Sequence, residues 1–294
     1  MRMAEAKQDQ AAGLRRMMNV EPVRVIAVTG GKGGVGKTNV AVNLAVALAV
    51  QEREVMLMDA DLGLANIDVV LGLHPRYNLS HVLSGERSLE EIVVTGPKGI
   101  QVVPGASGVK RMARLDSSQH AGLIRAFSDV GVHLDTLIID TAAGISDDVV
   151  SFSRAAQDIL VVVCDEPASM TDAYALIKLL NKDYGVGRFR VLSNMVKTVQ
   201  EGRELYNKLC RVTDRYLDVM LTYIGAVPFD ESLRKAVKGQ KPVLLAYPRS
   251  RSAQAFRAIA RKIDDWPLAT GNSGQLQFFV ERLIQYSSQL GEIV

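Results

Sequence analysis

The sequence predicts an α/β fold in which helices cover both faces of a mostly parallel, twisted sheet. Short apolar runs alternate with segments of helical period along the chain, which is the pattern of successive βαβ units. Hydrophobic residues make up 48% of the sequence and aromatic residues only 5%, as expected when Val, Leu, Ile and Ala surround buried parallel strands. Because no low-complexity linker divides the body, we expect one domain, residues 23–266, with arms at 1–22 and 267–294.

The individual elements follow from these runs in chain order. Apolar runs predict seven strands, at Val23–Thr29, Val55–Asp59, Ile100–Pro104, Leu134–Asp140, Ile159–Cys164, Phe189–Asn194 and Tyr223–Val227. Helical spacing predicts helices between them, among them Asn39–Ala49, Ala121–Ser128, Asp172–Lys182, Gly202–Tyr216 and Ser252–Asp264.

Charge and cysteine content exclude several classes of protein. A formal net charge of +3 is too small to imply a nucleic-acid partner. Cys164 and Cys210 form no C-x-x-C pair, so there is no zinc or redox motif, and a reducing cytoplasm fits. The arm at 1–22 lacks the apolar region of a secretory signal. The longest apolar run, 40–50, is interrupted by Asn43 and is shorter than the roughly 20 residues of a membrane span.

A glycine-rich loop provides the strongest functional signal. Gly30–Thr38 reads GGKGGVGKT and matches G-x-x-x-x-G-K-T between a strand and a helix, the context that a phosphate-binding P-loop requires. Glycines let backbone N–H groups wrap the phosphates, Lys37 would reach the β- and γ-phosphates, and the Thr38 hydroxyl would bind Mg²⁺. The motif therefore predicts a three-layer P-loop NTPase fold. The loop residues expected to contact the nucleotide are Gly31, Lys32, Gly33, Gly34, Val35, Gly36, Lys37, Thr38 and Asn39.

A second lysine, Lys32, distinguishes this loop from a plain P-loop. It would add positive charge where the γ-phosphate develops negative charge, and the alternative is a solvated lysine. KGGVGKT resembles the deviant Walker A motif of the MinD/ParA class of ATPases. In that class this lysine reaches the partner's nucleotide. The resemblance therefore implies an ATP-dependent homodimer and a slow, dimer-gated ATPase in which Lys32, Lys37 and Asp61 are the catalytic residues.

Two further stretches resemble the switch regions of that class. VMLMDADLGLANID, Val55–Asp68, implies that Asp61 orients the attacking water or binds the metal shell. LIIDTAAGI, Leu137–Ile145, implies that Asp140 holds Mg²⁺ through water and that Gly144 presents its backbone to the γ-phosphate. A helix cap or a surface ion pair is the alternative for each carboxylate.

Two more stretches, VLSNMV at Val191–Val196 and VPFDESLRKA at Val227–Ala236, resemble the adenine-reading segments of the class. The resemblance implies that Asn194 hydrogen-bonds adenine, with Pro228, Phe229 and Asp230 beside it, and Glu166 joins the expected nucleotide contacts. Asp230 would equally make an N-cap for the helix that follows.

The amino-terminal arm narrows the resemblance to one group. DQAAGLR, with DTAAGISDDVVSF and DEPASMTDAYALIKLL, resembles the flagellar-number ATPases of the FlhG/FleN group. In that group the amino-terminal helix stimulates the signal-recognition-type GTPase FlhF, and the ATP dimer restrains the flagellar master transcription activator, an AAA+ protein. Flagellar basal-body proteins are further implied partners, with a location near the cell pole. The residues expected to bind the GTPase are Asp9, Gln10, Ala11, Leu14 and Arg15.

Two alternatives stay open. Leu276–Leu290 has an apolar stripe with one basic residue, Arg282, so it either binds weakly to the inner face of the cytoplasmic membrane or packs on the body. A ParA-type DNA-partition ATPase is the rival function, although direct DNA binding is not expected. Its basic face would consist of Arg249, Arg251, Arg257, Arg261 and Lys262.

Overall fold

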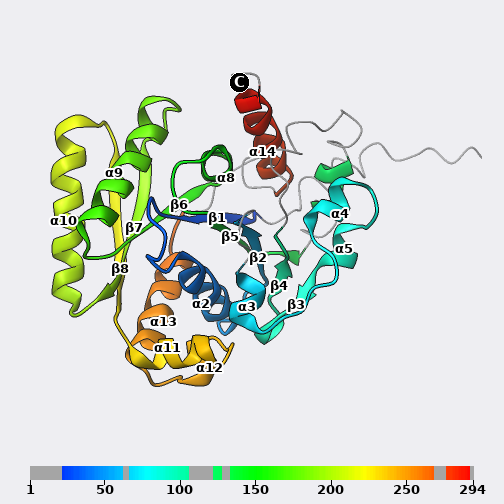
Figure 1. Ribbon diagram of the computed structural model, residues 1–294, viewed down its shortest axis with the longest axis horizontal. Helices are drawn as coiled ribbons and strands as arrows, with labels where there is room; N and C mark the ends of the chain where they lie inside the picture. The colour runs from blue at the N-terminus through cyan, green and yellow to red at the C-terminus, as the bar shows by residue number, and fades with distance from the viewer. Residues whose placement is uncertain (1–21, 62–65, 106–121, 128–132, 268–275, 292–294) are drawn as a thin grey trace, which may run out of the picture.

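A single eight-stranded sheet forms the centre of the computed structural model, which describes residues 22–61, 66–105, 122–127, 133–267 and 276–291. The strand order is β3-β4-β2-β5-β1-β6-β7-β8, and every pairing is parallel except that of β3 with β4 (Figure 1). The strands are β1 Arg24–Thr29, β2 Val55–Ala60, β3 Val94–Thr95, β4 Gln101–Val103, β5 Thr136–Thr141, β6 Asp158–Val163, β7 Arg188–Val196 and β8 Met220–Pro228.

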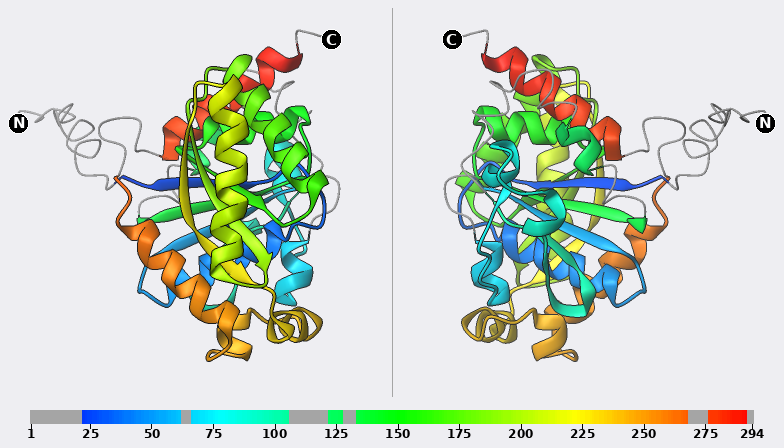
Figure 2. Two further views of the ribbon diagram at one scale, coloured as in Figure 1. Left: turned by 90° about the vertical axis from the view of Figure 1, so that its left-hand side faces the viewer. Right: turned by 90° about the vertical axis from the view of Figure 1, so that its right-hand side faces the viewer.

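Helices cover both faces of this sheet and make the fold three-layered, as the sequence predicts. One layer contains α2 Lys37–Ala49, α3 Ile67–Leu71, α11 Glu231–Lys238, α12 Val243–Ala246 and α13 Arg251–Asp264. The other contains α4 Leu79–Leu83, α5 Leu89–Ile92, α8 Asp147–Ala155, α9 Pro167–Lys182, α10 Val199–Tyr216 and α14 Leu276–Gly291. Figure 2 shows α13 and α14 on opposite sides of the sheet.

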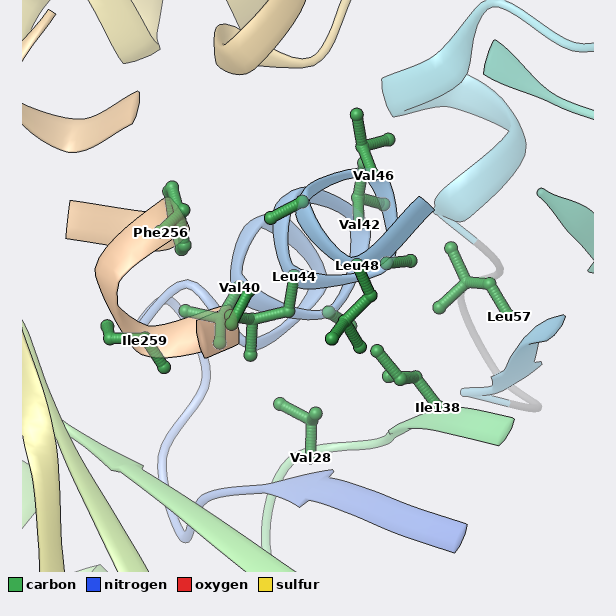
Figure 3. Close-up of a cluster of buried hydrophobic side chains, with 14 of the residues drawn as sticks. Val28, Val40, Val42, Leu44, Val46, Leu48, Leu57, Ile138, Phe256 and Ile259 are labelled. Atoms are coloured by element: carbon green, nitrogen blue, oxygen red, sulfur yellow. The ribbon is translucent and has the colours of Figure 1, made fainter. Parts of the chain in front are cut away.

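The core lies between the sheet and each helical layer. Within β1, Ile26 and Val28 face the α2 layer while Val25 and Ala27 face the α14 layer, as the two-residue period of a strand requires. Figure 3 shows Val28 and Ile138 of the sheet below α2, and Phe256 and Ile259 of α13 beside it. The helix α2 is buried over most of its length because α3 and α13 also pack against it.

The seven expected strands are all present, each within a few residues of its predicted bounds. The sequence did not indicate the two-residue antiparallel strand β3 or the short helices α3, α4, α5 and α12. Segments of two to five residues contain too little periodic pattern to be recognised. Of the predicted helix Ala121–Ser128, residues 122–127 are described and helical, and residues 121 and 128 lie outside the described part of the chain.

The helix α14 packs on the body of the protein. Its apolar stripe is buried against α8 and the sheet, through Leu276, Phe279, Val280, Leu283 and Ile284. Of the two alternatives for this segment, the structure has the packed arrangement, and the side chain of Leu290 is not among those described.

Candidate functional site

The glycine-rich loop joins β1 to α2 at the carboxyl edge of the sheet, where open α/β folds bind their ligands. Gly34 and Gly36 have φ angles of 82° and 89°, which L-residues with side chains rarely adopt. A Cβ atom on Gly31 would overlap the backbone of Asp172 in α9, and one on Gly36 would meet the Asn194 amide. The close approach of neighbouring chain segments therefore explains these glycines.

Two buried charged residues belong to this region, Lys37 at the start of α2 and Asp140 in β5. Lys37 is only 8% exposed and Asp140 only 1%. Burial lowers the pKa of Lys37, while the negative charges of Asp140 and Asp61 oppose that shift. Burial also raises the pKa of Asp140 from 3.8 to about 7, with a hydrogen bond from Thr38 opposing the rise and repulsion by Asp59 adding to it. Removal from water thus disfavours both charges, which bound charges of opposite sign would compensate.

The residues around Asp140 fit a divalent cation. The Asp140 Oδ1 atom is buried and has no hydrogen-bond partner among the described residues, and the Thr38 hydroxyl lies within hydrogen-bond reach of the same carboxylate. In the part of the chain that the structure describes, no three His, Cys, Asp or Glu side chains form a cluster that could hold a metal. Mg²⁺ suits such a sparse donor set because it keeps several waters and shares its ligands with substrate phosphates.

The second lysine lies at the rim of the loop. Lys32 forms a hydrogen-bonded ion pair with Glu166, the N-cap of α9, and both side chains are partly exposed. The hydrogen bond to Glu166 raises the pKa of Lys32. In this structure Glu166 therefore contacts the signature lysine of its own chain, and the reach of Lys32 to a partner subunit stays a prediction.

The segment that follows β5 contacts the first residue of the glycine-rich loop. The Gly144 N–H donates to the Gly30 carbonyl oxygen over 3.4 Å, and Gly144 has a φ of 96°. Next to it, Ile145 is 53% exposed although it is apolar. Gly144 thus lies against the first residue of the glycine-rich loop, and its contact with the γ-phosphate stays a prediction.

The expected base-reading residues lie at the carboxyl ends of β7 and β8. The Asn194 amide nitrogen donates to the Val35 carbonyl oxygen over 2.8 Å, and the Asn194 Oδ1 atom is buried without a partner in the described structure. Asn194 therefore ties β7 to the P-loop. Pro228 ends β8, and Phe229, which is exposed, donates its N–H to the Val196 carbonyl oxygen.

Both carboxylate oxygens of Asp230 have structural partners. Asp230 is the N-cap of α11 and accepts the Ser232 N–H over 2.8 Å. It also accepts the N–H and the hydroxyl of Ser252, over 2.9 and 2.8 Å, at the start of α13. Burial raises its pKa, but these hydrogen bonds outweigh that effect and hold the pKa below its usual value. The capping alternative is thus what the structure shows, and contact with a base stays a prediction.

Asp59 is a site residue that was not among the expected ones, although it opens the D-x-D pattern. It is the penultimate residue of β2, lies beside Asp140 in the sheet register, and accepts backbone hydrogen bonds from Asp61, Asn66 and Ile67. Burial raises its pKa from 3.8 to about 6. Asp61 itself is partly exposed.

The basic residues of the rival function are largely engaged with the backbone. Arg251, Arg257 and Lys262 donate to the carbonyl oxygens of Lys197, Pro248 and Ile224. Their positions are therefore explained by packing of α13 against neighbouring loops and β8.

Two remaining expectations concern partners and the membrane. The partner-binding residues Asp9, Gln10, Ala11, Leu14 and Arg15 lie outside the described residues. Within the described segments, no helix combines the length and hydrophobicity needed to span a bilayer.

The sheet order, the glycine loop and the buried Lys37–Asp140 arrangement together define a P-loop NTPase. Residues 21–264 match the ParA family, described as NUBPL iron-transfer P-loop NTPase. The chain is 60% identical to the antiactivator FleN of Pseudomonas aeruginosa, over 93% of this chain and 98% of that protein. It is 32% identical to the flagellum site-determining protein YlxH of Helicobacter pylori, over 95% and 99% of the two chains.

A solved structure shows the same fold. The septum site-determining protein MinD of Pyrococcus horikoshii, complexed with Mg-ADP, aligns with a TM-score of 0.64 and 27% identity, over 82% of this chain and 96% of that one. The chain therefore belongs to the ParA family of P-loop NTPases and, within it, to the FlhG/FleN group of the MinD/ParA class.

Proposed function

We propose that this protein is an ATP-dependent dimerising switch that regulates flagellar number and placement. The observation that carries the proposal is the deviant loop itself, in which a buried Lys37 stands beside Asp140 while a second, partly exposed lysine, Lys32, lies at the rim. A partly exposed lysine at the rim suits contact with a second subunit, for which its side chain would have to leave Glu166. Two relatives support the regulatory role: an antiactivator that is 60% identical and a flagellum site-determining protein that is 32% identical.

The proposed reaction is ATP + H₂O → ADP + phosphate. Phosphoryl transfer depends on positioning and on neutralising charge, and each residue has one of these tasks. Lys37 neutralises phosphate charge, Thr38 and Asp140 hold Mg²⁺, and Asp61 places the attacking water. When bound, Mg²⁺ would neutralise further negative charge on the phosphates and orient them. Lys32 would add a positive charge from the partner subunit, so that hydrolysis is slow until two subunits meet.

Partner control is the proposed output of the switch. The ATP dimer would restrain the flagellar master transcription activator, and Asp9–Arg15 would stimulate the FlhF-type GTPase. The name antiactivator, given to the Pseudomonas relative, supports the first part. A weak contact of α14 with the inner face of the cytoplasmic membrane near the pole belongs to this proposal. It requires the buried face of α14 to leave α8.

Light scattering with Mg-ATP tests the switch. Wild-type protein should shift from monomer to dimer, and Lys32→Ala should remain monomeric while still binding ATP. Lys182→Ala, an exposed lysine at the far end of α9, is the matched control and should dimerise normally. Normal dimerisation of Lys32→Ala would refute the role of Lys32 across the interface.

A GTP-hydrolysis assay of the FlhF-type GTPase, with and without this protein, tests the partner arm. Leu14→Ala combined with Arg15→Ala should abolish GTPase stimulation while ATP-dependent dimerisation persists. Loss of dimerisation in that variant would show instead that the arm belongs to the folded domain.

A further inference from the structure

The carboxylate of Asp59 occupies an unusual place for a buried charge. Asp59 is 3% exposed and lies in register beside Asp140, with β2 and β5 adjacent at the carboxyl edge of the sheet. Two buried carboxylates in neighbouring positions repel each other, so this arrangement is unfavourable for stability. A reason for it must lie in what Asp59 holds.

Asp59 holds both sides of the segment between β2 and α3. Its Oδ1 atom accepts the Asp61 N–H over 3.1 Å. Its Oδ2 atom accepts the N–H groups of Asn66 and Ile67 over 3.0 and 3.1 Å. One buried side chain near the end of β2 thus holds Asp61, where the chain leaves the sheet, and Asn66 and Ile67, where α3 begins.

The return point shows that Asp59 replaces a local device. Asn66 is the N-cap of α3, yet its own side chain makes no capping hydrogen bond. An N-cap side chain normally accepts the N–H groups of the first turn. Here the acceptor comes from the strand, eight residues before Ile67. A cap supplied in this way also fixes the position of α3 relative to the phosphate edge.

We propose that Asp59 is a positioning residue for hydrolysis, which acts by aiming Asp61 at the attacking water. This inference rests on the proposed ATPase function. Asp61 directly follows β2, and its N–H is bonded to Asp59, so the point at which its side chain leaves the backbone is fixed relative to the sheet. Hydrogen bonds to a charged acceptor are about twice as strong as neutral ones, which suits the task of holding Asp61, Asn66 and Ile67 in fixed positions.

Steady-state kinetics of Asp59→Asn, alone and combined with Asp61→Ala, test the proposal. The amide keeps the size of the carboxylate but offers one acceptor oxygen where two are needed. Loss of one or two such bonds should lower kcat about 10- to 100-fold with KM for ATP little changed. In the Asp61→Ala background Asp59→Asn should cause no further loss, because it acts through Asp61.

Asp68→Asn is the matched control. Asp68 is a nearby carboxylate in α3 whose Oδ1 atom accepts the N–H of its neighbour Val69, so wild-type kinetics are expected. Wild-type kcat in Asp59→Asn, or additive losses in the double variant, would overturn the proposal. If wild-type protein itself hydrolyses no ATP, the proposed function fails instead.

Amide hydrogen exchange provides a test that is independent of activity, and its wild-type measurement needs no variant. In wild-type protein the Asn66 and Ile67 amides should exchange slowly, and Asp59→Asn should speed their exchange while amides in β1 keep their protection. Exchange of these two wild-type amides at the rate of an open loop would overturn the positioning role.

Discussion

Replacing Asp140 with asparagine should stabilise the nucleotide-free protein at neutral pH. The carboxylate is almost completely buried, one of its oxygens has no partner in the described structure, and Asp59 repels it. Asparagine has nearly the same shape but no charge to desolvate. The change should therefore remove a cost that the nucleotide site imposes on the fold.

The magnitude follows from the pKa. Burial raises the pKa of Asp140 from 3.8 to about 7, so the folded state binds its proton more tightly than the unfolded state does. The protonated form therefore contributes stability that is fully present below pH 4 and is lost as pH rises through about 7. At 1.36 kcal/mol per pKa unit, burying Asp140 costs at most about 4 kcal/mol near pH 7.5, where the folded carboxyl is largely ionised, and about 2 kcal/mol at pH 5, where folding must protonate it.

Urea unfolding with EDTA and no nucleotide measures this gain. Asp140→Asn should unfold at higher urea than wild type at pH 7.5, and the difference should shrink at pH 5. Mg²⁺ with ATP should stabilise wild type and not the variant. Asp218→Asn, an exposed carboxylate at the opposite edge of the sheet, is the control and should change little at either pH. A variant less stable than wild type at pH 7.5, or an equal gain at both pH values, would refute the reasoning.

Three further predictions concern packing and capping. Asp230→Ala removes the acceptor for Ser232 and Ser252 and should lower the free energy of unfolding by about 2–3 kcal/mol. The pKa of Asp230 is held low in the folded protein. Urea titrations should therefore show the difference between variant and wild type shrinking as pH falls through that pKa. Phe279→Ala should cost about 3–5 kcal/mol, measured in the same way, because α14 is packed on the body. Gly31→Ala should abolish binding of a fluorescent ATP analogue by forcing the loop away from α9, and wild-type affinity would contradict that packing.

The sequence was sufficient for the parts of this protein that depend on local pattern. The seven longer strands and the P-loop were predictable because apolar runs and glycine spacing are written in consecutive residues. Expected roles could be given to Lys37, Thr38 and Asp140 because each belongs to a recognisable motif of consecutive residues. The FlhG/FleN group was predictable from long matching strings and is confirmed by the comparisons.

Other properties depend on contacts between residues distant in the chain, and only the tertiary structure decided them. The α14 stripe reads equally well as a membrane face or a packed face, because amphipathicity does not state what covers it; the burial against α8 does. Asp230 and Ser252 meet across two helix starts. Likewise Asp59 is one more acidic residue in a motif until its three backbone donors are brought around it by the fold, since hydrogen-bond partners are chosen in space.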